Sequence, residues 1–513
     1  MNKKLNYLIP SFGHLLFIIF MILILSRGGR LLGDGDTGYH IRAGEYIIAN
    51  IEVPKTDIFS FHSPEMDWTA HEWLSEVIMA VIHDFSGISG IVLFYTLILS
   101  LSFYMFFKVL NSLSNNIIIV WIVAFMGISC TGIHWLARPH VFSFLFLIIW
   151  YWILDSYEYK EKSSLIYYLP IIIVVWVNLH GGFILGLLLI GVYFIGNVLA
   201  LKKGNEENKK FIKNKIKKLF MIGLLCILAS MINPIGYKII FFPFKFITQK
   251  YLANYISEFM PTNMQEQLAF QIFFFFCLTI ILISKKKFDL TEGLLFLLLT
   301  YMSFKSVRYT TLFPLIVSPI IVKKLDFTIK ETNFKTIKFI KEKGENIGRA
   351  QKSAKGFIWV FIVIIASIIL IKKEMIVYNF NDEKHPVDAV NFLLEEEIKG
   401  NMFNNDEFGD YLIYAAYPKY KVFLDGRSDM YGEEMIEKYL EVIRIKSDWK
   451  KVLAEYGIDW VFYNSKSILS RYLYEQEDWH LIYADKVAHI YVKKNDKFKY
   501  IIERYKNIKP IYM

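Results

Sequence analysis

Cysteine is scarce in this chain, which has three among its 513 residues: Cys130, Cys226 and Cys277. Each lies within an apolar stretch, so none has a partner in a polar loop, and neither a disulfide framework nor a cysteine metal site is indicated. A zinc-binding helix is excluded at His71-Glu72, because Ser75 stands where the HExxH pattern requires its second histidine. The cysteines are therefore interpreted as small core residues.

Carboxylates are nearly absent from the apolar stretches, and those stretches are numerous. The chain is 55% hydrophobic, with a mean hydropathy of +0.36, whereas soluble domains are roughly 45–50% apolar. A transmembrane helix needs about 20 predominantly apolar residues. The sequence predicts an α-helical polytopic membrane protein with about eleven transmembrane helices, near residues 7–26, 87–107, 117–134, 140–154, 165–178, 181–200, 217–232, 267–284, 289–304, 309–322 and 356–372.

Lysine is unevenly distributed among the loops between these helices. The formal net charge is +10, and the lysines concentrate in residues 201–216, 285–288 and 323–355. Because positively charged loops face the cytoplasm, the pattern predicts a cytoplasmic N-terminus and an extracytoplasmic C-terminal tail. It also accounts for the basic charge without a nucleic-acid partner. No cleavage motif follows the first apolar run, which favours a retained helix over a secretory signal.

The C-terminal tail differs in kind from the rest of the chain. A helical stretch at 387–398 is followed by β-rich runs, a pattern typical of a compact α/β domain; these runs are 421–426, 459–464 and 480–494. The sequence therefore predicts two domains, a transmembrane domain at 1–372 with an outer loop at 33–76, and an extracytoplasmic α/β domain at 373–513.

Two further segments are expected to lie at the membrane surface. Residues 74–84 are too short to span the bilayer and are expected to form an amphipathic helix at the interface. Residues 233–266 contain three prolines and many aromatic residues, which predicts a helix along the outer surface or a re-entrant loop.

Polar residues other than lysine gather on the side of the membrane predicted to be outside. Such groups are costly near a bilayer and mark functional sites, and their one-sided distribution predicts one shared outer cavity. The candidate residues are Asp34, Asp36, His40 and Glu72 in the outer loop, Arg138, His140, His180 and Arg308 at helix ends, and Asp425 and Arg427 in the tail.

Several of these residues have a second interpretation. Asp34 and Asp36 could be solvated turn residues, because Gly33, Gly35 and Gly38 make this stretch a flexible loop. Arg138 could anchor the interface, although a guanidinium also matches the geometry of phosphate. Asp425 and Arg427 could form a salt-bridged turn that holds the tail together. The residue pattern leaves these alternatives open.

The motifs around these residues resemble a known family. The runs D-x-G-Y-H-I-R-x-G-E-Y-I, W-x-x-H-E-W-L-S-E, A-R-P-H-V-F-S, N-L-H-G-G-F-I-L-G and V-F-L-D-G-R-S-D-M-Y are similar to a group of bacterial multi-spanning proteins related to GT-C membrane glycosyltransferases. That superfamily includes protein mannosyltransferases and enzymes that use polyprenyl-phosphate sugars. The resemblance runs from about residue 30 to about residue 493, and it implies a protein of the bacterial plasma membrane.

The resemblance implies roles for particular residues. In GT-C enzymes an acidic residue of the first outer loop acts as general base toward the acceptor or orients it, and Asp36 occupies that place here, with Asp34 as the second choice. The acidic pair departs from the adjacent Asp-Glu that is usual in protein mannosyltransferases, since it reads Asp-Gly-Asp. The leaving phosphate needs cationic or hydrogen-bonding partners, and the candidates are Arg138, His140, His180 and Arg308. The implied partners are a lipid-linked sugar donor, membrane lipids, and an acceptor glycan, lipid or protein; a divalent cation is possible as a cofactor.

Two other classes of function compete with this interpretation. A transporter or lipid flippase usually places polar groups near the bilayer midplane within broken helices, whereas here they lie at one end of the spans. A non-catalytic scaffold of the cell envelope would use the same fold and its outer domain to bind a partner.

Overall fold

The computed structural model describes residues 7–62, 66–160, 164–202, 206–242, 244 and 256–512. These residues form two compact units. The helical unit comprises Met1–Gly28, Leu93–Trp135 and Pro139–Ile376, and the mixed unit comprises Gly29–Val92, Leu136–Arg138 and Val377–Met513.

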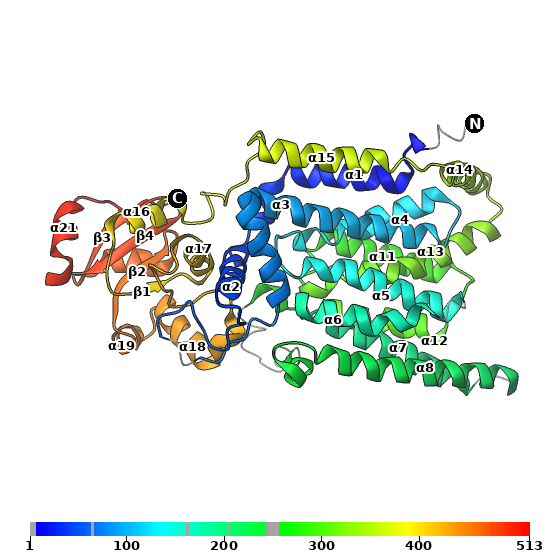
Figure 1. Cartoon of the computed structure of the whole chain (residues 1–513), viewed down its shortest axis with the longest axis horizontal. Helices are drawn as coiled ribbons and strands as arrows, with labels where there is room; N and C mark the ends of the chain where they lie inside the picture. Colours follow the sequence, from blue (N-terminus) through cyan, green and yellow to red (C-terminus); the bar gives the residue numbers. More distant parts are fainter. Residues whose placement is uncertain are drawn as a thin grey trace. The chain divides into compact units, whose positions relative to one another are not determined.

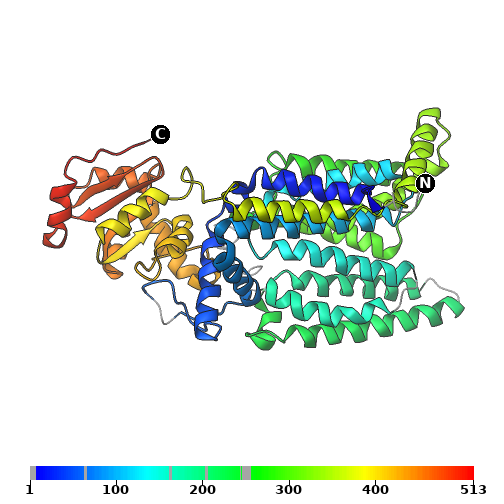
Figure 2. The same ribbon diagram turned by 45° about the horizontal axis from the view of Figure 1, so that its top comes forward.

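The helical unit is built of long apolar helices that lie side by side (Figures 1 and 2). Its α-helices are α1 (Phe12–Leu25), the second part of α3 (Trp73–Asn111), α4 (Ile117–Ser129), α5 (Val141–Tyr159), α6 (Leu169–Leu179), α7 (Phe183–Leu201), α8 (Glu206–Ser230), α11 (Leu268–Ile283), α12 (Leu290–Lys305), α13 (Phe313–Glu331), α14 (Lys335–Gln351) and α15 (Ile358–Lys372). Short 3-10 helices connect them: η3 (Gly132–His134), η4 (Leu165–Tyr168), η5 (Gly236–Ile240), η6 (Ser257–Phe259) and η7 (Val307–Thr311).

Local sequence explains where several of these helices begin. The Ser11 hydroxyl accepts a hydrogen bond from the His14 amide at the start of α1, while the His14 ring accepts one from the Ser11 amide. Asp289 caps α12 by accepting from the Glu292 amide. Gly87, at φ 58°, separates α3 into two helical parts, since few residues other than glycine adopt that conformation.

Each of the predicted membrane spans coincides with a helix of this unit. Among the described residues, three helices are long and apolar enough to cross a membrane: Trp73–Asn111, Val141–Tyr159 and Phe183–Leu201. Five further apolar helices have 10–17 residues. The predicted helical fold class with membrane-spanning helices is therefore confirmed, whereas the number of eleven spans stays a prediction.

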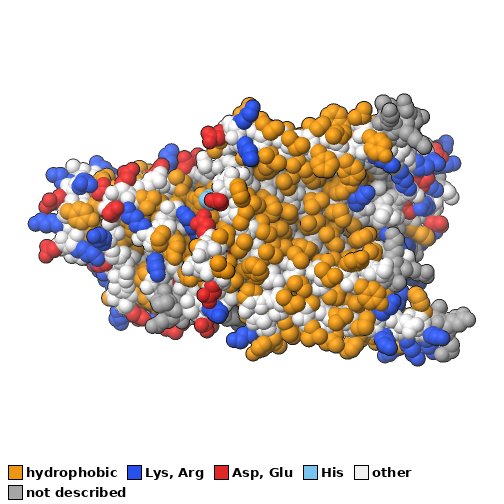
Figure 3. Space-filling model, viewed as in Figure 1, with side chains coloured by type: hydrophobic (Ala, Val, Ile, Leu, Met, Phe, Trp, Pro, Cys, Tyr) orange, Lys and Arg blue, Asp and Glu red, His pale blue; other side chains and the backbone are white. Residues whose placement is uncertain are grey.

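The surface of the helical unit agrees with a membrane environment. Hydrophobic side chains cover it between its two ends in Figure 3. Large apolar side chains that are exposed include Ile19, Phe220, Leu224, Phe361 and Ile365. Lysines and arginines gather at the end where α14 lies (Figures 1 and 3). An apolar surface of this extent is stable where lipid rather than water contacts it.

The mixed unit contains a four-stranded sheet with helices around it (Figure 1). The strand order is β1-β2-β4-β3; β1 and β2 are parallel, and the other pairs are antiparallel. The strands are β1 (Asn401–Asn404), β2 (Ile458–Asn464), β3 (Trp479–Ala484) and β4 (Ala488–Lys493). The helices are η2 (Gly28–Leu32), α2 (Asp36–Asn50), the first part of α3, α16 (Val387–Glu396), α17 (Asp406–Ala416), α18 (Ser428–Ile443), α19 (Trp449–Glu455), α20 (Ile468–Tyr474), η8 (Asp496–Phe498) and α21 (Lys499–Arg504).

The tail differs from its predicted strands at one place. Residues 421–426 were expected to form a strand, but they make only an isolated bridge between Val422 and Ser60. The Asn404 side chain takes the place of a neighbouring strand, because its oxygen accepts from the Phe423 amide at 2.7 Å and its nitrogen donates to the Leu424 carbonyl at 2.7 Å. The predicted strands at 459–464 and 480–494 are confirmed, the latter as the hairpin of β3 and β4.

The outer loop at 33–76 contains regular structure and joins the tail. Residues 36–50 form α2, and the loop after it pairs with the tail, since the Phe61 amide donates to the Val422 carbonyl and the Val422 amide donates to the Phe59 carbonyl. The lysine-rich segment 323–355 is likewise helical over α14. Of 233–266, residues 243 and 245–255 lie outside the described part, and η5 and η6 flank them.

Candidate functional site

Asp34, Asp36 and Arg138 form the polar centre of the mixed unit. Arg138 holds both carboxylates: its Nη1 lies 2.6 Å from Asp34 Oδ2, and its Nη2 lies 2.5 Å from Asp36 Oδ2. The Asp36 amide donates to Asp34 Oδ1 at 2.9 Å, which fixes the turn before α2. The Asp36 side chain is 12% exposed and that of Arg138 is 20% exposed. A substrate group could therefore reach this cluster from solvent.

Glycines position Asp36 by letting α2 pack closely against α17. A Cβ on Gly35 would lie 2.9 Å from the Asp410 Cβ, and one on Gly38 would lie 2.7 Å from the Asp410 carbonyl oxygen. Arg42, one turn further along α2, donates from Nε and Nη2 to the Tyr414 carbonyl in the last turn of α17. The glycines of this motif therefore serve helix packing, rather than the flexible loop that the sequence suggested.

Asp410 is a further carboxyl group beside Asp36 that sequence reasoning missed. A Cβ on Gly426 would lie 2.5 Å from Asp36 Oδ1 and 2.9 Å from Asp410 Oδ2, so both side chains border the same small space. The Gly426 amide donates to Asp410 Oδ1 at 3.0 Å. Burial, and then the nearby charges of Asp36 and Asp425, raise the pKa of Asp410 well above its usual range. Its pattern in the sequence, one of three acids within an amphipathic helix, does not distinguish it from a surface residue.

We expect Asp410→Asn to stabilise the mixed unit at neutral pH, and to do so more as the pH rises. A carboxyl whose folded pKa is raised binds more protons in the folded state, so its contribution to stability falls as pH rises from the unfolded pKa of about 4 toward the folded value. An amide removes that dependence. Thermal unfolding of both proteins between pH 5 and 8 measures it, and a difference in stability between variant and native protein that is constant across that range would contradict the raised pKa of Asp410.

His40 and Glu72 lie in the same unit, and His40 follows Asp36 by about one turn of α2. His40 is 3% exposed, and its Nδ1 lies 3.2 Å from Glu76 Oε1. Glu72 lies just before α3, with Oε1 3.6 Å from His71 Nε2. Burial raises the pKa of Tyr39, and the charges of Asp36 and Glu72 raise it further, which places both carboxylates near one phenol. Asp36 and Glu72 are therefore both within electrostatic reach of Tyr39.

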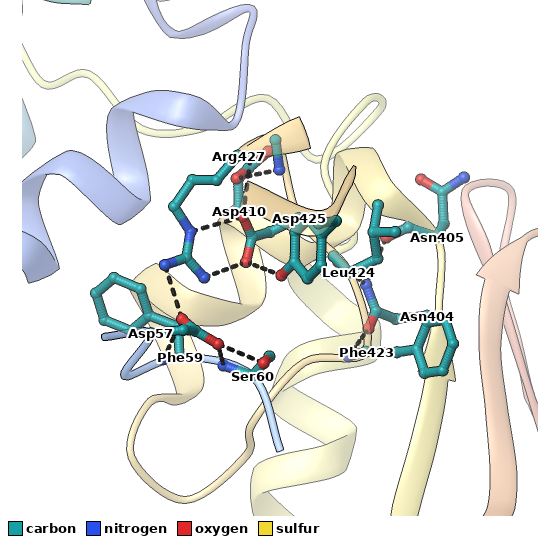
Figure 4. A network of polar contacts seen from close by, with 12 residues as sticks. Asp57, Phe59, Ser60, Asn404, Asn405, Asp410, Phe423, Leu424, Asp425 and Arg427 are labelled. Carbon is teal, nitrogen blue, oxygen red and sulfur yellow. Dashed lines mark hydrogen bonds and ion pairs between the residues drawn. The ribbon is translucent and has the colours of Figure 1, made fainter. Parts of the chain in front are cut away.

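Asp425 and Arg427 belong to a buried ion-pair network (Figure 4). Arg427 Nη2 lies 2.6 Å from Asp425 Oδ2, and its Nη1 lies 2.8 Å from Asp57 Oδ1. The Tyr431 hydroxyl also donates to Asp425, and Asp57 accepts from Ser60 and Phe59. Both aspartate side chains have no exposed surface, and that of Arg427 is 2% exposed. This geometry favours the salt-bridged turn over direct contact with a substrate.

The remaining candidates lie in the helical unit. His180 ends α6, and its Nδ1 lies 2.6 Å from the Ser143 hydroxyl of α5. Its Nε2 lies 3.2 Å from Arg308 Nη2, which is in η7. His140 precedes α5, and its ring centroid lies 6.3 Å from that of His180. Arg308, His140 and His180 therefore form a second polar cluster, and Ser143 is a member that the sequence did not single out.

The first cluster offers few ligands for a divalent cation. Arg138 contacts both Asp34 and Asp36, and its single positive charge offsets one of the two carboxylate charges. Among the residues described, no group of three or more histidine, cysteine, aspartate or glutamate side chains could hold a metal ion. The chemistry available here is therefore a carboxylate oriented by an arginine, beside a second carboxyl whose pKa is raised by burial.

Comparison with known proteins supports a fold class. No family model and no curated protein match the chain. A structure of the archaeal oligosaccharyltransferase AglB from Archaeoglobus fulgidus, in complex with an inhibitory peptide and a dolichol-phosphate, resembles it with a TM-score of 0.58 and 11% identity, over 89% of this chain and 70% of that one. The Archaeoglobus fulgidus oligosaccharyltransferase in its apo form gives a TM-score of 0.55 and 10% identity, over 94% and 74%.

These similarities show the fold. The chain shares the fold of these archaeal oligosaccharyltransferases, which agrees with the resemblance stated for its motifs. At this identity the likeness carries no residue roles, so the function is argued from the clusters themselves.

Proposed function

We propose that this protein is a GT-C-type glycosyltransferase that moves a sugar from a polyprenyl-phosphate-linked donor to an acceptor at the outer face of a bacterial plasma membrane. The observation that supports this best is Asp36, a carboxylate oriented by Arg138 at the start of α2 in a protein with the GT-C fold. The donor class agrees with the dolichol-phosphate bound by AglB.

In the proposed reaction Asp36 is the general base. An acceptor hydroxyl attacks the anomeric carbon and forms the new bond to it, while the bond from that carbon to the phosphate oxygen breaks. Asp36 takes the hydroxyl proton, and the phosphate leaves with the bonding electron pair. Arg138 orients Asp36 through their ion pair. Arg308 and His180 stabilise the negative charge that grows on the phosphate.

The proposed orientation follows from the distribution of lysines. The N-terminus and residues 323–355 are cytoplasmic, residues 33–76 and 373–513 are outside, and about eleven helices cross the membrane. Single cysteines introduced after replacing the three native ones should react with an impermeant reagent in intact cells at positions of the tail. Reaction from outside at a site within α14 would contradict this orientation.

The proposal is tested by transfer in a defined system. The purified full chain is reconstituted with polyprenyl-phosphate-linked sugars and candidate acceptors, and release of free polyprenyl phosphate is measured. Release that requires both acceptor and protein supports a transferase. Movement of the lipid-linked sugar between leaflets with no release would instead indicate a flippase, and the absence of both activities with retained acceptor binding would indicate a scaffold.

A further inference from the structure

Helix α14 lies across the end of the helical unit instead of running along it. Figure 1 shows this helix end-on, next to bundle helices that run across the view, and Figure 2 shows it nearly perpendicular to them and extending past their edge. Its 17 residues span about 25 Å. A helix that crosses the spans of a membrane protein at the level where they end lies along the membrane surface.

The C-terminal half of α14 is fixed to the connection between α3 and α4. A Cβ on Gly344 would lie 1.9 Å from the side-chain oxygen of Asn116. A Cβ on Gly348 would lie 2.2 Å from the carbonyl oxygen of Asn115, so both glycines permit a close approach. The Asn116 side-chain nitrogen also donates to the Ile340 carbonyl at 3.3 Å. These contacts determine which face of α14 is turned toward the bundle.

The face that carries these glycines continues toward the start of α14 with apolar side chains. Ile337, Ile340 and Gly344 follow one another at intervals of three and four residues, so they share one face of the helix. Both isoleucines are partly exposed. Because this face is turned toward the bundle, the part of α14 that extends past the bundle edge presents it to the membrane surface.

The apolar face of α14 is flanked by lysines whose charge is not balanced locally. Residues 335–355 contain seven basic residues against two acidic ones. The helical period places Lys338 and Lys341 to one side of the apolar face and Lys343 to the other. Among the described residues, no lysine of α14 forms an ion pair with a carboxylate. A helix that is apolar at the centre of one face and positive along its sides is complementary to an anionic lipid surface.

We propose that α14 is an interfacial helix that binds the anionic headgroups of the lipid leaflet at this end of the bundle through Lys338, Lys341 and Lys343. Ile337 and Ile340 rest on the boundary between headgroups and acyl chains, while the lysine stems lie along the surface and keep their ammonium groups in water. Each lysine close to an anionic surface strengthens such binding about fivefold. The contact anchors the connection between α13 and α15 to the membrane, and it goes beyond the proposed transfer reaction without depending on it.

Amide hydrogen exchange of the full chain in nanodiscs tests this contact. Residues 337–343 should exchange at least about fivefold more slowly in phosphatidylcholine discs that contain about 30% phosphatidylglycerol than in discs of phosphatidylcholine alone, because this half of α14 must leave the anionic surface before it opens. Salt at about 1 M should abolish the difference, since the Debye length falls to about 3 Å. Residues 344–351, which are held by the bundle, should change less and provide an internal reference.

A pair of double variants separates charge recognition from general effects of the lipid. Lys338→Gln with Lys341→Gln should remove most of the slowing by phosphatidylglycerol and leave α14 helical, because glutamine and lysine have similar helix propensities. Lys285→Gln with Lys287→Gln, which changes two exposed lysines just after α11, is the matched control and should retain the slowing. Equal exchange of residues 337–343 in the two lipid compositions would overturn the proposal. A full effect of phosphatidylglycerol in the first double variant would overturn it as well.

Discussion

Asp36→Asn is expected to reduce sugar transfer by about 10²–10⁴-fold, the usual effect of losing a general base. The amide keeps the size and shape of the carboxylate but cannot accept a proton at neutral pH. In the native protein Arg138 Nη2 lies 2.5 Å from Asp36 Oδ2. In the variant this ion pair becomes a weaker hydrogen bond to a neutral amide oxygen. Release of polyprenyl phosphate under single-turnover conditions measures the chemical step, and binding of the polyprenyl phosphate should be nearly unchanged.

Asp34→Asn is the matched control for this variant. Asp34 contacts the same guanidinium, at 2.6 Å from Arg138 Nη1, and its other oxygen accepts from the Asp36 amide. Its side chain is 27% exposed against 12% for Asp36. If Asp34 only orients the turn, its amide variant should lose much less activity. A nearly inactive Asp34→Asn beside an active Asp36→Asn would exchange the two roles, and full activity of the double variant would remove this cluster from catalysis.

The sequence predicted the helical class of this protein well, because apolar stretches of sufficient length have few alternatives to a helix. All the predicted spans coincide with helices, from α1 to α15. It predicted the tail less completely. The side-chain amide of Asn404 makes the hydrogen bonds to Phe423 and Leu424 that a neighbouring strand would otherwise make. The strand propensity of residues 421–426 does not show whether their backbone bonds to a strand or to a side chain.

The site could be predicted only in part, for a reason that lies in tertiary packing. Asp34, Asp36 and Arg138 were singled out, and the structure joins them through one guanidinium. Asp410 was missed, because its role depends on α17 lying against Gly35 and Gly38, a contact between residues far apart in the chain. Whether His140, His180 and Arg308 act with the first cluster in one cavity stays a prediction.

Arg427→Met is expected to destabilise the mixed unit by about 3–5 kcal/mol, the usual cost of removing one partner from a buried ion pair. The guanidinium lies over the rings of Phe59 and Trp68, and it bonds to Asp425 and Asp57. Methionine fills much of the same volume but leaves two carboxylates without their counter-charge. For a unit of this size the unfolding midpoint should fall by about 10 °C, which differential scanning fluorimetry of the full chain detects.

The loss of stability in Arg427→Met should depend on pH, and the direction of that dependence identifies its cause. Burial alone would raise the pKa of Asp57, but the charge of Arg427 and the hydrogen bonds from Ser60 and Phe59 outweigh it and lower that pKa. A carboxyl with a lowered pKa stabilises the fold above its unfolded pKa of about 4, and this stability is lost as the pH falls through the folded value. The difference between native protein and Arg427→Met should therefore shrink on acidification.

Lys450→Met provides the comparison with a surface ion pair. Lys450 contacts Asp478 at 3.1 Å in the same unit, but the two side chains are 54% and 55% exposed, so its loss should cost less than about 1 kcal/mol. The pair of variants also decides between the two interpretations of Arg427. A large loss of stability with unchanged binding of acceptor and donor identifies a structural network. Unchanged stability with weaker binding would instead return Asp425 and Arg427 to the substrate site, because a guanidinium that holds no structure is available to hold a ligand.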